Sequence, residues 1–166
     1  MTRFFAQPHD PDETGFHFEA ADEFQLRAEK LMDQSGQPVD SYAIQLIEGE
    51  SIDCEIAILF GIRPENISEF INFTRNASDH DKAEYIIGVR ECGCDPTANP
   101  DNFGVTAFET DSYRDLARNF VEEALISEVG RYLHAQIDHD AIERDIREEY
   151  TETEIAGRTF LYRYEE

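Results

Sequence analysis

The stretch SYRDLARNFVEEAL, residues 112–125, shows the most regular helical pattern in the chain. Ser112 and Asp115 have the spacing of an N-terminal capping box, in which two side chains bind free N–H groups at the start of a helix. Four apolar side chains then recur at helical spacing: Leu116, Phe120, Val121 and Ala124. The stretch therefore predicts an amphipathic helix with one buried face.

Further elements surround this helix within residues 101–166. The segments FGVTAFE (103–109) and TFLYRYEE (159–166) alternate apolar side chains as strands do. A second helix is expected from Asp138, whose carboxylate can cap the N–H groups of residues 140 and 141. The expected inner face of this helix consists of Ala141, Ile142, Asp145, Ile146 and Tyr150. These patterns predict a C-terminal α/β domain.

The first fifty residues predict a second small α/β domain. Strand patterns occur in RFFA (3–6), GFHFEA (15–20) and VDSYAIQLIEGE (39–50). A helical pattern covers residues 20–36 and is expected to end at Gly36.

Residues 51–100 predict a helical middle domain. A first helix is expected after Ser51 as N-cap, with Cys54 buried in it and Gly61 as terminator. A second has Pro64 in its first turn, and a third begins at Ser78. The expected buried stripe of the second helix is Ile67, Phe70, Ile71 and Thr74. The loop CGCDPTANPDN (92–102) then marks a boundary, so the fold class is predicted as α+β, an elongated chain of small α/β and helical subdomains.

The charge balance is the strongest functional signal in the sequence. Asp and Glu number 37 against 14 Lys and Arg, which gives a formal net charge of −23. A compact chain of this length has a diameter of roughly 40 Å, and roughly 40 Å of duplex DNA carries about the same negative charge. Such a field repels nucleic acid and anionic membranes and attracts basic partners. Neither nucleic acid nor a membrane is therefore an expected partner.

The acidic composition is also consistent with two different hypotheses. A protein of a halophile is also acidic and poor in lysine, and only Lys30 and Lys82 occur here. Alternatively, the Asp-His-Asp triplets at residues 79–81 and 138–140 would serve a divalent-metal-dependent enzyme. Each triplet also stands at an expected helix start, where an acidic side chain has a capping role. We therefore expect no metal, no cofactor and no catalytic residues.

The cysteines indicate a reducing compartment. Cys54, Cys92 and Cys94 are odd in number and lack the spacing of a disulfide framework or a zinc site. The first residues also lack a signal-peptide pattern, so a cytoplasmic location is expected.

The segment LARNFVEEALISEVGRYLHAQIDHDAIERDI (116–146) resembles the C-terminal signature of the ArdA antirestriction proteins of plasmids, transposons and phages. In that family, an acidic helix end is followed by a block with an Arg-Asp pair. The positions of this block are occupied here by Asp138, His139, Ala141, Arg144, Asp145 and Ile146. The segments YIIGVRECG (85–93) and GFHFEAADEFQLRAEKL (15–31) are similar to members of the same family.

This resemblance implies a homodimer that mimics duplex DNA, occupies the DNA-binding groove of type I restriction–modification enzymes and performs no chemistry. It implies a role in the fold or the dimer for Asp138, Ala141, Arg144, Asp145 and Ile146. The carboxylates expected to imitate phosphates and to contact the methyltransferase core are Glu109, Asp111, Asp115, Glu122, Glu123, Glu128, Asp140, Glu143, Glu148, Glu149 and Glu152.

Overall fold

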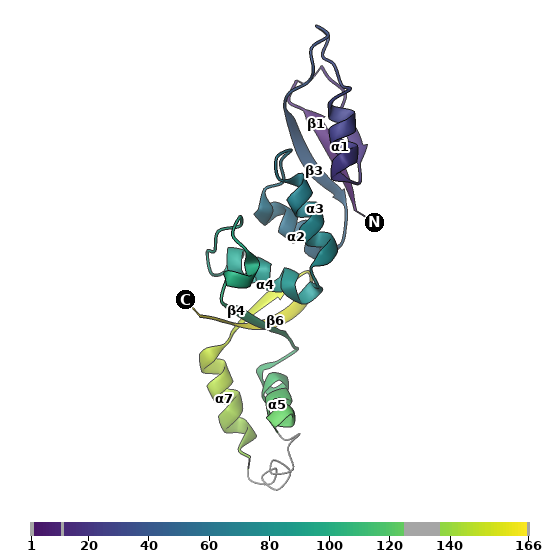
Figure 1. Ribbon diagram of the computed structural model, residues 1–166. Helices are drawn as coiled ribbons and strands as arrows, with labels where there is room; N and C mark the ends of the chain where they lie inside the picture. The colour runs from purple at the N-terminus through teal and green to yellow at the C-terminus, as the bar shows by residue number, and fades with distance from the viewer. Residues whose placement is uncertain (1, 11, 125–136, 166) are drawn as a thin grey trace. The chain divides into compact units, whose positions relative to one another are not determined.

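The computed structural model describes residues 2–10, 12–124 and 137–165 (Figure 1). These ranges contain α-helices and two antiparallel three-stranded sheets, which confirms the α+β prediction. Contacts divide the chain into two compact units: an N-terminal unit, Met1–Lys82 with Asp95–Thr97, and a C-terminal unit, Ala83–Cys94 with Ala98–Glu166. The helical section 51–100 that the sequence predicts thus contributes residues to both units.

The sheet of the N-terminal unit has the strand order β2-β1-β3. Its strands are β1 (Arg3–Pro8), β2 (Phe16–Phe18) and β3 (Tyr42–Glu48). The central strand places Phe4 opposite both Phe18 and Leu46. All three strands occur where the alternating apolar pattern predicts them.

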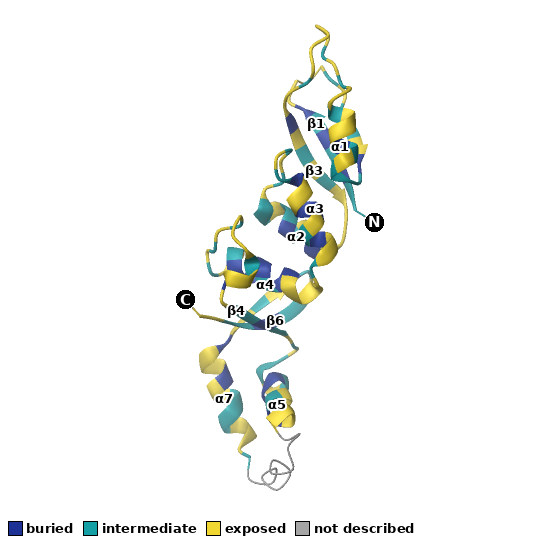
Figure 2. Ribbon diagram, viewed as in Figure 1, coloured by how far each residue is buried: buried dark blue, intermediate teal, exposed yellow. Residues whose placement is uncertain are grey.

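Aromatic rings form the core of the N-terminal unit. The ring of Phe4 stacks on Phe18 at 5.1 Å and meets Phe70 of helix α3 (Ile67–Asn76) edge to face at 5.9 Å. Phe24 of helix α1 (Ala21–Ala28) lies 5.1 Å from Phe18. Such pairs add stabilisation to the burial of the rings. All four residues of the predicted α3 stripe, Ile67, Phe70, Ile71 and Thr74, are buried, and Figure 2 shows buried and exposed residues interspersed along this helix.

Helix α1 is shorter than the sequence predicts. It ends at Ala28 rather than near Gly36. The carboxylate of Asp33 accepts hydrogen bonds from the N–H groups of Ser35 and Gln37, both at 2.8 Å, and so holds the chain in a turn. Gly36 belongs to this turn, with φ of 77°. The short Asp33 side chain thus accepts hydrogen bonds from N–H groups that would otherwise donate within a continued helix.

Three details of the neighbouring helices also differ from the prediction. Helix α2 (Ser51–Phe60) begins at Ser51, so Glu50 rather than Ser51 stands at the N-cap position, although Gly61 ends the helix as predicted with φ of 61°. Cys54 is exposed, because the buried side chains of α2 are Ile52, Asp53 and Ile56. Pro64 precedes α3, since the side chain of Asn66 accepts a hydrogen bond from the Arg63 N–H and forms a turn there.

Helix α4 (Asp79–Arg90) begins with the predicted cap at Ser78. The Ser78 hydroxyl donates to the Asp81 carboxylate at 2.7 Å and accepts from the Asp81 N–H at 3.2 Å. The bonds from the Ser78 hydroxyl and N–H lower the pKa of Asp81 below its usual value. The stability that this cap contributes is therefore present above the unfolded-state pKa and lost as the pH falls through the folded-state pKa.

A buried ion pair joins α2 to the first turn of α4. Lys82 Nζ lies 2.7 Å from Asp53 Oδ1, and the two side chains are only 5% and 6% exposed. Asp53 Oδ1 accepts no well-aligned hydrogen bond from any described residue. At this distance the contact is nevertheless an ion pair, because Coulomb attraction does not require alignment.

The sheet of the C-terminal unit has the strand order β4-β6-β5. Its strands are β4 (Val105–Glu109), β5 (Thr151–Ile155) and β6 (Arg158–Tyr164). The sequence did not predict β5. Ala156 and Gly157 form its turn to β6 with φ of 50° and 76°, a conformation for which Asn-Gly is the usual signal. A 3₁₀ turn (Pro100–Asn102) lies in the predicted loop before β4.

Helices α5 (Tyr113–Ala124) and α7 (His139–Glu149) share a core with this sheet. Its buried members are Leu116, Ala117, Ile146, Tyr150 and Leu161, with Phe108, Tyr113, Phe120 and Ile142 packed against them. Two expected inner-face residues are exposed, Ala124 and Asp145. The inward direction of α7 follows Ile142, Ile146 and Tyr150 at intervals of four residues, and Asp145 is turned about 100° from Ile146.

Gly88 in α4 supports close packing in the C-terminal unit. A Cβ atom at this position would overlap the Phe103 ring. We expect Gly88→Ala to lower the free energy of unfolding by about 1–3 kcal/mol, although alanine favours a helix, because the added methyl overpacks the core. Urea denaturation measures this change. The double variant Gly88→Ala/Phe103→Leu should recover part of the loss, and an unchanged midpoint for Gly88→Ala would contradict the steric argument.

Candidate acidic interaction surface

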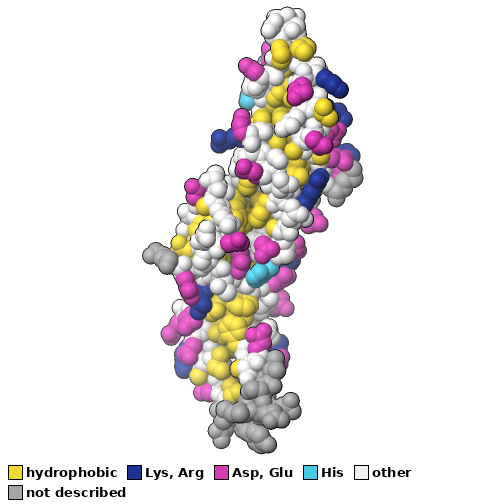
Figure 3. Space-filling model, viewed as in Figure 1, with side chains coloured by type: hydrophobic (Ala, Val, Ile, Leu, Met, Phe, Trp, Pro, Cys, Tyr) yellow, Lys and Arg dark blue, Asp and Glu magenta, His cyan; other side chains and the backbone are white. Residues whose placement is uncertain are grey.

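The predicted partner-binding carboxylates that the structure describes lie on α5, on α7, on strands β4 and β5, and, for Asp111, between β4 and α5 in the C-terminal unit. The apolar sides of both helices face the shared core, so their charged side chains point outward. Figure 3 shows many Asp and Glu side chains on the visible surface of the protein. The predicted residue Glu128 lies outside the described residues.

Capping carboxylates start both helices. The Ser112 hydroxyl donates to Asp115 at 2.6 Å and accepts from the Asp115 N–H, which confirms the predicted capping box. Asp138 accepts a hydrogen bond from the Ala141 N–H at 3.0 Å, as predicted for the N-cap of α7. Asp115 and Asp138 therefore have structural roles whatever their effect on a partner.

The cap of α7 can be tested directly. Asp138→Ala should lower the free energy of unfolding by about 1 kcal/mol, because the Ala141 N–H loses its acceptor. Asp138→Asn retains an acceptor oxygen and should stay close to the parent protein. Thermal or urea unfolding of the two variants provides the comparison, and equal losses would show that charge rather than capping is important at this position.

Half of the described candidate carboxylates form ion pairs with arginine. Glu109 pairs with Arg158 at 3.2 Å, and Asp115 pairs with Arg118 at 2.7 Å. The remaining pairs are Asp140–Arg114 at 3.3 Å, Glu143–Arg114 at 3.4 Å, Glu143–Arg147 at 2.9 Å and Glu149–Arg163 at 3.7 Å. These arginines partly neutralise the carboxylates that they contact.

Glu143 is the least suited of these residues to imitate a phosphate. Its side chain is only 20% exposed and lies between two arginines. The sequence contains a signal for one of these pairs, since Glu143 and Arg147 are four residues apart on a helix. The pair with Arg114 joins α7 to α5 and depends on tertiary packing.

Five candidate carboxylates are exposed and have no ion pair with any described residue. They are Asp111, Glu122, Glu123, Glu148 and Glu152. The sequence placed Glu152 on the face of a helix, but it lies on strand β5. We call these five residues the unpaired carboxylates.

The residues of the Arg-Asp block have different environments. Ile146 is 5% exposed and anchors α7 in the core, while Ala141 is half-buried. Arg144 and Asp145 are exposed and form no ion pair with the described part of the chain. Within one chain the fold therefore uses Ile146, Ala141 and the Asp138 cap, and a role of Arg144 and Asp145 in a dimer stays a prediction.

The geometry gives the histidine triplets a structural role. Asp81 and Asp138 both act in helix caps. No group of three or more His, Cys, Asp and Glu side chains arranged to hold a metal ion occurs among the described residues. Burial is the largest cause that raises the pKa of the Cys92 thiol, and the nearby charges of Cys94 and Glu91 raise it further. A raised pKa keeps a thiol protonated and so disfavours nucleophilic or metal-binding chemistry.

The negative charge is shared almost equally between the two units. The N-terminal unit has 18 acidic and 6 basic residues, a formal charge of −12, and the C-terminal unit has 19 and 8, a charge of −11. The charge therefore belongs to the whole folded chain and is not confined to one acidic segment.

Comparison of the chain with protein-family models, with curated proteins and with solved structures finds no match. Among the described residues, every helix is too short or too polar to cross a membrane.

Proposed function

We propose that this protein is an antirestriction protein of the ArdA type, a non-enzymatic mimic of duplex DNA. It occupies the DNA-binding groove of a type I restriction–modification enzyme and contacts the methyltransferase core. It acts in the cytoplasm as a homodimer. The observation that carries the proposal is the negative charge of −12 and −11 on two folded units of similar size.

The unpaired carboxylates support this proposal. DNA-binding grooves are lined with Lys and Arg that neutralise phosphates, and an exposed carboxylate can pair with the same cations. Carboxylates that already pair with arginine offer less charge to a partner. On the C-terminal unit, the residues that contribute most to binding are therefore Asp111, Glu122, Glu123, Glu148 and Glu152; exposed acids of the N-terminal unit such as Glu69 contribute on that unit.

The metal-dependent alternative has less support. Asp81 and Asp138 of the two triplets are used as helix caps.

Competition with DNA tests the proposal. The protein should displace labelled duplex DNA from a type I methyltransferase core. The affinity of the protein for that core should fall more than about 100-fold between about 50 and about 200 mM salt, because salt screens many charge pairs. The protein should also remain folded by circular dichroism at the lower salt concentration. Failure to displace DNA there would contradict mimicry, and unfolding there would favour the halophile alternative.

A further inference from the structure

Strand β3 has the longest open edge in the described part of the chain. It pairs with β1 on one side and with no described strand on the other. The other edge strands, β2, β4 and β5, have three, five and five residues, against seven in β3.

The open edge of β3 lacks the usual protection. Proteins guard exposed edges with charged residues or proline, and β5 carries Glu152 and Glu154. In β3, residues 42–47 read YAIQLI and contain neither charge nor proline. A strand of this kind is a template for pairing with another extended chain.

An apolar groove lies beside this edge. It is an open hollow of about 280 Å³ lined by Ile44, Leu46, Cys54, Ala57, Ile58 and Ile62. Leu46 is opposite Phe4, whose ring packs on Phe70 of α3, so the groove lies on the helix-covered face of the sheet. Ile58 of α2 is 81% exposed and Ile47 on β3 is 52% exposed. Ile58 and Ile47 thus expose apolar surface to water beside the unpaired main-chain groups of the β3 edge.

The edge and the groove together match the geometry of strand addition. A strand added to β3 would send alternate side chains to opposite faces of the sheet. Those on the helix-covered face would meet the groove at Leu46 and Ile58, and those on the other face would lie near Ile47. In this recognition mode the main chain provides affinity and the side-chain hollows provide specificity.

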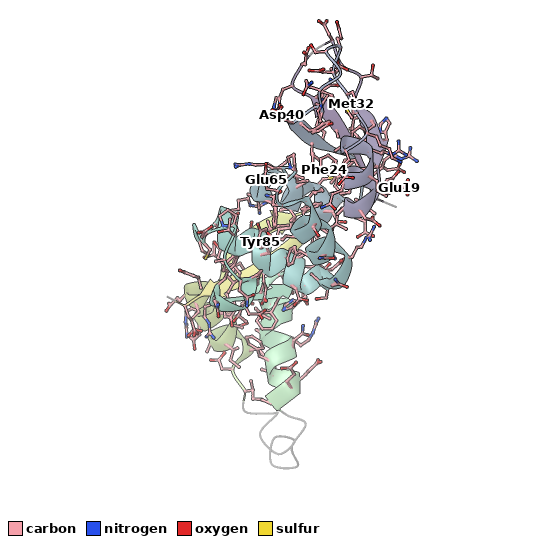
Figure 4. All side chains as sticks on the ribbon, turned by 45° about the horizontal axis from the view of Figure 1, so that its top comes forward. Glu19, Phe24, Met32, Asp40, Glu65 and Tyr85 are labelled. Atoms are coloured by element: carbon pink, nitrogen blue, oxygen red, sulfur yellow. The ribbon has the colours of Figure 1, made fainter. Side chains whose placement is uncertain are left out.

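Acidic residues border the site and define the chemistry of its occupant. A second open hollow, of about 400 Å³, shares Ile44 and Ile62 with the groove and is lined also by Asp40 and Glu65, whose side chains are labelled in Figure 4. Glu48 and Glu50 are exposed at the other end of β3. Of the described residues that line the two hollows, Arg63 is the only Lys or Arg. A second copy on this edge would bring the same acidic border against it, whereas Lys and Arg side chains of another protein would be attracted to it.

We propose that the β3 edge and its groove bind an extended segment of another protein by strand addition, and that this segment alternates apolar residues with Lys or Arg. This site is separate from the proposed mimicry, because it uses main-chain pairing and apolar contact on the N-terminal unit. It would give the protein a peptide-binding activity that does not require an imitation of phosphates.

A pair of synthetic peptides tests this site on the full chain. One peptide alternates Val with Lys and the other alternates Val with Glu. The Lys peptide should bind in fluorescence anisotropy at least about 10-fold more tightly than the Glu peptide. Hydrogen exchange should show new protection at alternate amides of β3, since only strand addition pairs them.

Two matched variants separate the groove from general charge attraction. Ile58→Lys and Leu26→Lys each replace an exposed aliphatic side chain on a helix with Lys, and Leu26 on α1 does not line the groove. Ile58→Lys should weaken binding of the Lys peptide at least about 10-fold, and Leu26→Lys less than about 3-fold. Equal losses, or binding without protection of β3, would overturn the proposal. Concentration-dependent dimerisation that Ile58→Lys abolishes would also overturn it and assign the edge to a second copy.

Discussion

Lys82→Met should lower the free energy of unfolding by about 3–5 kcal/mol, more than Gly88→Ala or Asp138→Ala. The substitution removes the partner of Asp53, whose side chain is 6% exposed, and leaves a carboxylate buried without a counter-charge. Single domains are stable by only about 5–15 kcal/mol, so the variant should be partly unfolded under mild conditions. Equilibrium urea unfolding measures the loss.

Two controls show whether the cost arises from the uncompensated charge. The double variant Asp53→Leu/Lys82→Met replaces the pair with apolar side chains and should recover most of the stability, because removal of both charges avoids the desolvation penalty. Arg27→Met breaks the exposed pair with Glu23, and it should cost less than about 1 kcal/mol. If Lys82→Met were as harmless as Arg27→Met, the ion pair would be open to water in solution.

Neutralisation of all five unpaired carboxylates should produce the largest loss of inhibitory activity. The variant changes Asp111 to Asn and Glu122, Glu123, Glu148 and Glu152 to Gln. Exposed ion pairs contribute about 0.2–1 kcal/mol each, so five of them give about 1–5 kcal/mol, and the middle of this range corresponds to about 100-fold in affinity. Inhibition of a type I methyltransferase, titrated at low salt, measures the effect.

The control retains the five charges and changes the side chains that carry them. Exchange of Asp for Glu and of Glu for Asp at the same positions should alter inhibition less than about 3-fold, because mimicry depends on charge. Each single neutralisation should cost less than about 5-fold, since each exposed pair contributes at most about 1 kcal/mol. A single neutralisation that abolished inhibition in a folded protein would indicate one specific contact instead of a mimicked DNA surface.

The strands and helices with regular apolar spacing could be predicted from the sequence. The stripe of α3 and the caps at Ser78, Ser112 and Asp138 depend on residues close together in the chain, and local rules describe them well. The early end of α1 was missed because the side chain of Asp33 competes for main-chain N–H groups. Strand β5 was missed because its turn places Ala156, instead of Asn or Gly, at a positive φ.

The candidate surface was predicted less well than the fold. Sequence shows which residues are acidic, but it does not show which of them meet an arginine from another element. Arg114 on α5 contacts Asp140 and Glu143 on α7, across 26 and 29 residues of chain, and this pairing depends on how the two helices pack. The buried pair of Asp53 with Lys82 was missed for the same reason. Its residues are 29 positions apart, and charged residues are buried only rarely.

Because the edge of β3 is open, the negative charge of the protein also affects its colloidal stability. Uncharged strand edges of neighbouring molecules join readily into extended sheets, and a formal charge of −12 on each N-terminal unit keeps such edges apart in solution. As Asp and Glu become protonated toward the isoelectric point of about 4.3, this repulsion is lost while the edge of β3 stays open. The acidic residues thus act as a barrier against edge-to-edge aggregation, and acidification should favour sheet-rich aggregates nucleated at β3.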